Sequence, residues 1–130
     1  MRVAINYLER PATEEELQIA ELLEQMLKLI QHNELETLET FYHYGTNLPE
    51  NTEVGDITSK ENKRLKNIRE GRPKMKELVF RDVLIRVKSA IEATVFFQRA
   101  VLLSGEWRHR VSSRVLNLQK IQNRWYILYS

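Results

Sequence analysis

The sequence has no cysteine, and only four glycines, three prolines and three histidines among its 130 residues. Without cysteine the chain can form neither a disulfide framework nor a thiolate that would act as a nucleophile or metal ligand. The glycines form no phosphate-binding loop, and no nucleophile elbow is present. No two histidines stand four residues apart, so we expect no metal site and no cofactor.

Long apolar runs are also missing. No stretch approaches the roughly 18 residues of a membrane-spanning helix, and residues 1–10 contain no apolar block of the size that a secretory signal needs. An apolar fraction of 42% and a charged fraction of 29% are ordinary for a globular chain. We therefore expect one cytoplasmic domain over residues 1–130, with residues 1–12 as an N-terminal arm and with no membrane partner.

Charge is divided unevenly along the chain. Residues 1–57 carry 12 acidic and 3 basic side chains, whereas residues 58–130 carry 6 acidic and 17 basic ones. The two parts either neutralise each other across the fold or a dimer, or leave an anion-binding surface. Many of the basic residues gather in segment 60–76, and Arg108, Arg110 and Arg114 form a second group. Segment 60–76 has no aromatic side chain for stacking on bases, so we expect a solvated helix face and no nucleic-acid partner.

An amphipathic helix is predicted over residues 14–31. Thr13 and Glu16 have the spacing of a capping box at its start. A second, shorter helix is expected after Asn33 as its N-cap, and a third over residues 60–70. The long helix carries apolar residues at helical spacing, which predicts one buried face: Ile19, Leu22, Leu23, Met26, Leu29 and Ile30.

From residue 75 onward the apolar pattern takes the period of β-strands, and β-branched and aromatic residues become dense. Ser104-Gly105 and Gln122-Asn123 stand where tight turns would join consecutive strands. The pattern predicts a four-stranded antiparallel meander. Its strands are expected at residues 77–87, 94–103, 106–121 and 124–129.

The third of these strands changes phase within its length, since its apolar residues alternate in one phase before Ser112 and in the other after Ser113. A one-residue bulge at this point would bring Trp107 and the later leucines onto one apolar face and would bend the strand. Helix 14–31 is the only element long enough to cover that face. We therefore expect an α+β fold in which N-terminal helices pack on a curved antiparallel sheet to form a cone-shaped barrel. The helix should bury Leu23, Met26 and Ile30 against Trp107, Leu118 or Trp125.

This order of elements, closing on Asn123-Arg124-Trp125-Tyr126-Ile127, resembles the nuclear-transport-factor-2-like superfamily, which includes SnoaL-like cyclases and ketosteroid-isomerase-like proteins. The resemblance covers roughly residues 13–130 and rests on element order, length and the closing aromatic strand. It implies a pocket between the long helix and the concave sheet, and commonly a homodimer through the outer face of the sheet. It implies no single activity, because such a fold hosts many functions.

The candidate pocket residues follow from strand register and from the resemblance. A two-residue turn at Ser104-Gly105 would set His109 opposite Ala100 and beside Gln98. His109 is then either a general acid or base, since histidine often has that role, or a core histidine satisfied by one neighbour. Tyrosines after the second helix either lie at the pocket rim or pack at the helix end. The predicted ligand-binding residues are Tyr42, Tyr44, Gln98, Trp107, His109 and Trp125.

Three functions remain open at this point. The first is a small pocket protein that binds an apolar or amphipathic small molecule, without assured catalysis. The second is a lyase or isomerase that uses His109 as its acid or base. The third is an interaction module that docks an acidic protein or nucleic acid through basic residues 60–76. Two titratable groups within hydrogen-bond reach in one cavity would favour the enzyme.

Overall fold

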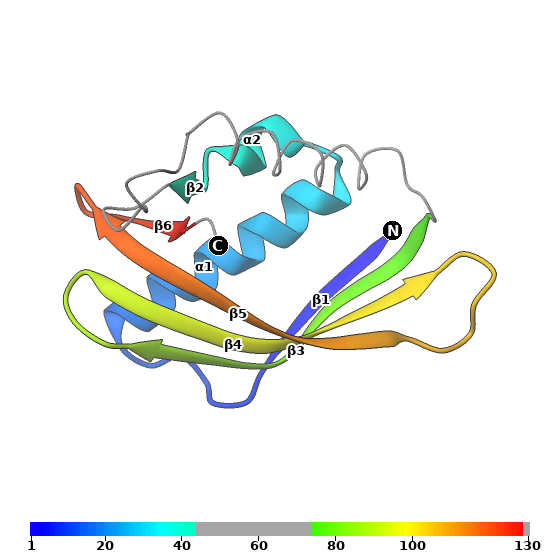
Figure 1. The fold of residues 1–130 in the computed structure, drawn as a ribbon, viewed down its shortest axis with the longest axis horizontal. Helices are drawn as coiled ribbons and strands as arrows, with labels where there is room; N and C mark the ends of the chain where they lie inside the picture. The colour runs from blue at the N-terminus through cyan, green and yellow to red at the C-terminus, as the bar shows by residue number, and fades with distance from the viewer. Residues whose placement is uncertain (44–73, 129–130) are drawn as a thin grey trace, which may run out of the picture.

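The computed structural model describes residues 1–43 and 74–128, which form two helices and one six-stranded sheet (Figure 1). The strands lie side by side in the order β1-β3-β4-β5-β6-β2. The elements are β1 (Arg2–Tyr7), α1 (Glu14–Gln31), α2 (Leu35–Glu39), β2 (Tyr42–His43), β3 (Met75–Val87), β4 (Glu92–Leu103), β5 (Arg110–Ile121) and β6 (Arg124–Leu128).

Helix α1 has the bounds that the sequence predicts. The capping box is formed, because the Thr13 hydroxyl accepts a hydrogen bond from the Glu16 backbone N–H at 3.2 Å. The Glu16 carboxylate in turn accepts one from the Thr13 backbone N–H at 3.0 Å. Two of the unpaired N–H groups at the start of the helix are thereby satisfied.

Helix α2 is short, and the prediction that Asn33 caps it is wrong. Asn33 has a φ of 58° and lies just past the end of α1, a position that often takes the left-handed conformation. Its backbone N–H donates to the carbonyl of Ile30, and Glu34 occupies the N-cap position of α2 without a side-chain hydrogen bond. The predicted helix at 60–70 lies outside the described residues.

The predicted meander is confirmed as β3, β4, β5 and β6, which pair antiparallel in sequence order. The turn between β5 and β6 is the tight one expected. Gln122 and Asn123 have φ values of 50° and 65°, and Ile121 pairs with Arg124. Two consecutive positive φ angles match the twist of a two-residue hairpin.

The segment predicted as an N-terminal arm, residues 1–12, contains the strand β1. β1 pairs parallel with β3, with Arg2 beside Glu77 and Ile5 beside Phe80, and so forms one edge of the sheet. The short strand β2 forms the other edge, parallel to β6. The sheet is therefore mixed at both edges and antiparallel in between. Val3, Ile5 and Tyr7 pack against the core, which explains why this short segment is ordered.

The predicted bulge at Ser112-Ser113 is wrong. Pairing of β5 with β4 runs without a register shift from Arg110 to Gln119. The irregularity lies in β3, where the pairing with β4 shifts between Arg81 and Leu84 around Asp82, which has a φ of 52°. A bulge of this kind bends its strand and increases the local twist, as the curved sheet of Figure 1 illustrates.

Helix α1 lies in the concave side of this curved sheet and packs on β1, β3 and β6 (Figure 1). Leu23, Met26 and Ile30 are buried, as predicted, in one core cluster. Leu118 and Trp125 belong to the same cluster. The prediction that Trp107 also packs under the helix is wrong.

Candidate functional site

The sheet has two chemically different faces, which the alternation along β4 makes plain. Val95, Phe97 and Val101 point to the concave side and are buried in the core cluster. Phe96 and Gln98 point to the outer side and are exposed. Because paired residues on neighbouring strands share a face, the register assigns each candidate side chain to one face or the other.

The register of the β4–β5 hairpin differs from the predicted one. Val101 pairs with Arg110 and Ala100 with Val111, so residues 104–109 form a longer loop than a two-residue turn. His109 is therefore not opposite Ala100. Trp107 and His109 lie in this loop, and Gln98 faces outward opposite Ser113. The prediction that these three residues line the concave face is wrong in its geometry, although the structure does not test whether they act in binding or catalysis.

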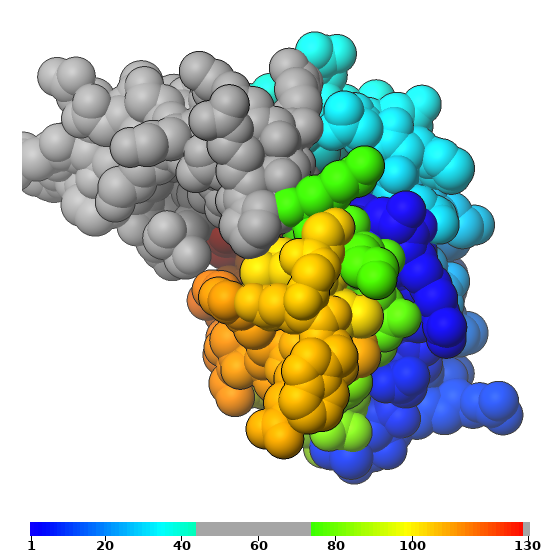
Figure 2. All heavy atoms as spheres, turned by 90° about the vertical axis from the view of Figure 1, so that its right-hand side faces the viewer, coloured from blue at the N-terminus to red at the C-terminus, as the bar shows by residue number. Residues whose placement is uncertain are grey.

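His109 is paired with a carboxylate on the outer side of the sheet. Its Nε2 lies 2.7 Å from Glu77 Oε1, and the Nε of Arg2 lies 3.7 Å from Glu77 Oε2. The hydrogen bond from His109 lowers the pKa of Glu77. These contacts join the loop, the start of β3 and β1, which lie next to one another in Figure 2. Through Glu77, His109 thus links the loop between β4 and β5 to β3 and β1.

Trp107 is the most exposed large apolar side chain that the structure describes, at 81% of its full exposure. The guanidinium of Arg108 lies over its ring, 4.6 Å from the centroid. Arg110, the first residue of β5, forms an ion pair with Glu106 of the loop, and its hydrogen bond lowers the pKa of Glu106. Trp107 therefore projects from the loop and does not belong to the concave wall.

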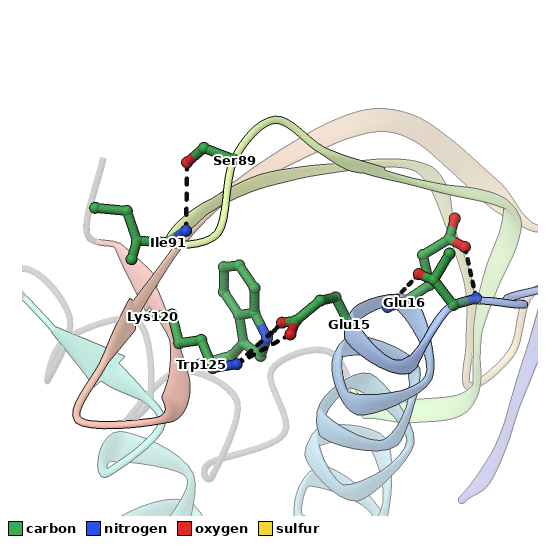
Figure 3. Close-up of polar contacts among 7 residues, drawn as sticks. Glu15, Glu16, Ser89, Ile91, Lys120 and Trp125 are labelled. Atoms are coloured by element: carbon green, nitrogen blue, oxygen red, sulfur yellow. Dashed lines mark hydrogen bonds and ion pairs between the residues drawn. The ribbon is translucent and has the colours of Figure 1, made fainter.

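Trp125 lies on the concave side and anchors the start of α1. Its Nε1 donates to Glu15 Oε2 at 3.1 Å. Lys120 Nζ, on the neighbouring strand, donates to both oxygens of the same carboxylate at 3.1 Å (Figure 3). These bonds tie α1 to β5 and β6 and occupy the polar atoms of all three side chains.

Tyr42 is half-buried on β2, beside Ile127 of β6, and packs against the core cluster. Tyr44 lies outside the described residues. Of the six predicted ligand-binding residues, Tyr42 and Trp125 are therefore the two that the structure assigns to the concave side.

The concave face also carries polar side chains that the sequence analysis missed. Arg99 of β4 pairs with Phe80 on one side and Ser112 on the other. Arg114 of β5 pairs with Phe97. Both arginines therefore share a face with core aromatic residues. We call Arg99 and Arg114 the concave arginine pair.

The two arginines differ in their surroundings. Arg99 is half-buried, and its Nη2 lies 4.0 Å from Met75 Sδ. Ser112 is also half-buried, whereas Arg114 is exposed at the rim. Among the described residues, no carboxylate lies within ion-pair distance of Arg114. The rings of Phe80 and Phe97, which pair with the two arginines across the strands, are tilted against each other with centroids 4.4 Å apart, and both are buried in the core cluster.

A signal for this site was present in the sequence. Arg99 stands in phase with Phe97 and Val101, and Arg114 in phase with Leu116. The predicted bulge changed the phase of the strand at Ser112-Ser113, so Arg114 was not recognised as a residue of the face that carries Phe97. An arginine in the phase of buried apolar residues indicates a position where a charge faces the interior.

The described part of the chain, residues 1–43 and 74–128, brings together no group of three or more histidine, aspartate or glutamate side chains that could hold a metal ion. Nor does a helix in this part have the length and apolar character needed to cross a membrane.

Comparison with known proteins identifies the fold. No family model matches the chain, and no curated protein sequence does either. Among solved structures, a nuclear-transport-factor-2-like protein of unknown function from Shewanella oneidensis is similar, with a TM-score of 0.59 and 16% identity over 85% of this chain and 91% of that one. A nuclear-transport-factor-2-like protein from Campylobacter jejuni aligns with a TM-score of 0.46 and 15% identity over 85% of this chain and 97% of that one.

The chain therefore has the nuclear-transport-factor-2-like fold, an α+β architecture with helices packed in a cone-shaped sheet. The family resemblance seen in the sequence is confirmed at the level of the fold.

Proposed function

We propose that the protein binds an apolar or amphipathic small molecule on the concave face of β4 and β5. The observation that carries this proposal is the pair of half-buried polar side chains, Arg99 and Ser112, set among buried apolar ones. Small-molecule sites are usually concave and mostly apolar, with a few polar groups that orient the ligand. The fold is compatible with such a site, since the sheet curves around α1 (Figure 1).

The alternatives have less support. For a lyase or isomerase, His109 would need to face the bound substrate, but its ring is hydrogen-bonded to Glu77 on the other side of the sheet. Most of segment 60–76 lies outside the described residues. Docking of an acidic partner through this segment is therefore supported by its positive charge alone. No observation favours either function over ligand binding.

The test uses N-phenyl-1-naphthylamine, a neutral dye whose fluorescence rises in apolar surroundings. We expect saturable binding, because the dye is apolar and needs no charged partner on the protein. Ser112→Phe should abolish this binding by filling the concave face, whereas Ser113→Phe, which adds the same ring to the outer face, should leave it unchanged. Both variants must first give the wild-type circular dichroism spectrum. No dye binding to the wild type, or equal loss in both variants, would contradict the proposal.

We also propose that two copies associate through the outer face of the sheet. Phe96, Val111 and Val115 are 43%, 50% and 53% exposed there, on a face with alternating apolar and polar rows. Three consecutive rows across β3, β4 and β5 are Val79–Ala100–Val111, Arg81–Gln98–Ser113 and Leu84–Phe96–Val115.

This pattern suits a two-fold symmetric dimer. A two-fold axis along the middle, polar row sets the first apolar row of one copy against the third, also apolar, row of the other. The next rows outward then bring Glu77 of one copy toward Arg86 of the other, and each of these residues already has an ion-pair partner in its own chain. One symmetry operation thus aligns the apolar rows without burying an unpaired charge of these rows.

Light scattering after size-exclusion chromatography tests the dimer. We expect the wild type to elute as a dimer and Phe96→Asp to elute as a monomer, because a charge would be buried without a partner. Ile91→Asp is the matched control, since Ile91 is 50% exposed near the β3–β4 turn, away from the three rows. A monomeric wild type, or a Phe96→Asp variant that stays dimeric, would overturn this proposal.

A further inference from the structure

We infer that the loop between β4 and β5 docks an acidic segment of a partner protein, with Trp107 and Arg108 holding one of its carboxylates. This goes beyond the proposed function, because the loop lies at the end of the sheet and not on its concave face (Figure 1). The basis is an exposed pair of a tryptophan and a cation, of the kind that holds a carboxylate elsewhere in the same molecule.

The internal pair is formed by Trp125 and Lys120. Lys120 Nζ lies 5.8 Å from the centroid of the Trp125 ring. Both side chains donate to the carboxylate of Glu15 at 3.1 Å, from the indole Nε1 and from Nζ (Figure 3). A carboxylate is thus the group that an indole N–H and a neighbouring cation recognise together.

Trp107 and Arg108 form the exposed pair. The Arg108 guanidinium lies over the ring, 4.6 Å from its centroid, and Trp107 is 81% exposed. No described residue forms a hydrogen bond with Trp107 Nε1 or an ion pair with Arg108. Because an indole N–H only donates and a guanidinium is always charged, both groups select an acceptor, and a carboxylate satisfies both.

Two lysines extend this surface. Lys74 and Lys76 are exposed where β3 begins, and the backbone N–H of Ser104 in the loop donates to the Lys74 carbonyl at 2.8 Å. Within the described residues, neither lysine has a carboxylate at ion-pair distance. We call Trp107, Arg108, Lys74 and Lys76 the Trp107 patch. It presents an apolar ring among positive charges, which is complementary to an acidic segment.

The loop is held in place by its own contacts. The Glu106 N–H donates to the Leu103 carbonyl at 3.0 Å, and the Glu106 carboxylate pairs with Arg110. His109 Nε2 lies 2.7 Å from Glu77 Oε1. Both glutamates are therefore engaged in local pairs, and the charge of the Trp107 patch is left for a partner. An ordered loop also loses little conformational entropy on binding.

The Trp107 patch favours a polypeptide over nucleic acid or a lipid surface. Single-stranded nucleic acids stack successive bases on aromatic side chains, whereas this patch has one ring, and Arg108 lies over it. Burial in a lipid surface needs an apolar face, but the chain neighbours of Trp107 are the charged residues Glu106 and Arg108. Tryptophan and arginine are enriched among the residues that dominate protein–protein binding energy.

Fluorescence anisotropy tests the docking with a fluorescein-labelled peptide of Glu-Glu-Leu repeats and its uncharged counterpart of Gln-Gln-Leu repeats. We expect saturable binding of the acidic peptide and about tenfold weaker binding of the uncharged one. Trp107→Ser should weaken binding about tenfold, as for a central interface residue. Arg108→Gln should weaken it about threefold, as for an exposed ion pair.

The matched controls lie in the β3–β4 turn. Lys88→Gln removes a positive charge there, and Ile91→Ser removes a side chain that is 50% exposed. Both should change the affinity by less than about twofold. All the substituted positions are exposed, so the variants should fold.

The two tryptophans supply a second measurement. The indole N–H signal of Trp107 should shift in the NMR spectrum during titration with the unlabelled acidic peptide, whereas that of Trp125, which is 3% exposed, should not. The inference is wrong if the acidic peptide binds no better than the uncharged one, if Trp107→Ser and Ile91→Ser lose equal affinity, or if the Trp125 signal shifts instead. It is also wrong if phosphatidylserine vesicles or oligothymidylate bind through Trp107 more tightly than the acidic peptide, because the partner would then be a membrane or a nucleic acid.

Discussion

Truncation of Leu23 tests how α1 is held in the concave sheet. The side chain of Leu23 is 0% exposed and belongs to the core cluster. Leucine-to-alanine changes at such sites cost roughly 2–5 kcal/mol, the sum of lost burial and the cavity left behind. For a chain of this length, 1 kcal/mol corresponds to about 4 °C in melting temperature, so the Leu23→Ala variant should melt about 8–20 °C lower.

The same helix provides the control. Leu17 is 53% exposed, and Leu17→Ala makes the same chemical change with an expected loss of less than about 0.5 kcal/mol. Urea unfolding followed by circular dichroism measures the free energy of unfolding of both variants against the wild type. Equal losses in the two variants, or a loss below about 1 kcal/mol for Leu23→Ala, would refute the argument that this face of α1 is the buried one.

Two further predictions concern the charged contacts of α1. Glu15→Ala leaves Lys120 without its carboxylate and should lower the free energy of unfolding by about 1.5–3 kcal/mol. Glu14→Ala, in the same helical turn, should change it by less than about 0.5 kcal/mol. Urea unfolding measures the free energy of unfolding of both variants. Burial and the neighbouring Glu24 raise the pKa of Tyr7 above its ordinary 10.0. The protonated phenol is therefore favoured in the folded state, and its stabilisation is complete below pH 10 and lost as the pH rises further. A Tyr7→Phe variant that still lost as much stability as the wild type above pH 10 would contradict this.

Local sequence patterns predicted most of the fold. The spacing of apolar residues and the Thr13 capping box set the bounds of α1, and turn residues such as Asn123 set the last hairpin. These features depend on residues close together in the chain, so periodicity and capping rules capture them.

Long-range pairing explains what was missed. β1 is short and gains its order from parallel pairing with β3, some 75 residues away in the chain, as Arg2 opposite Glu77 illustrates. No local signal records such a pairing. A bulge was predicted at Ser112-Ser113 because the apolar pattern changes phase there. In the structure, β5 has no bulge and carries apolar residues such as Val111 on its outer face. The irregular pairing lies instead in β3, around Asp82.

The candidate site was lost through the same error. The predicted bulge would keep the apolar residues of this strand on one face. The prediction therefore placed Trp107 and His109 on the concave side as well. The structure instead leaves Val111 and Val115 exposed on the outer face and places Arg114, which is also exposed, on the concave face. These exposed apolar residues are the ones that the proposed dimer would cover.

Mapping the ligand by NMR tests the central claim most directly. The backbone amide shifts of the protein would be followed during titration with N-phenyl-1-naphthylamine and then with octanoate. Binding at the concave face predicts the largest shifts at Phe97, Arg99, Ser112 and Arg114, with smaller ones along the outer loop 104–109. Shifts confined to that loop and to the exposed outer rows around Val115 would contradict the account, because the ligand would then occupy the other face of the sheet.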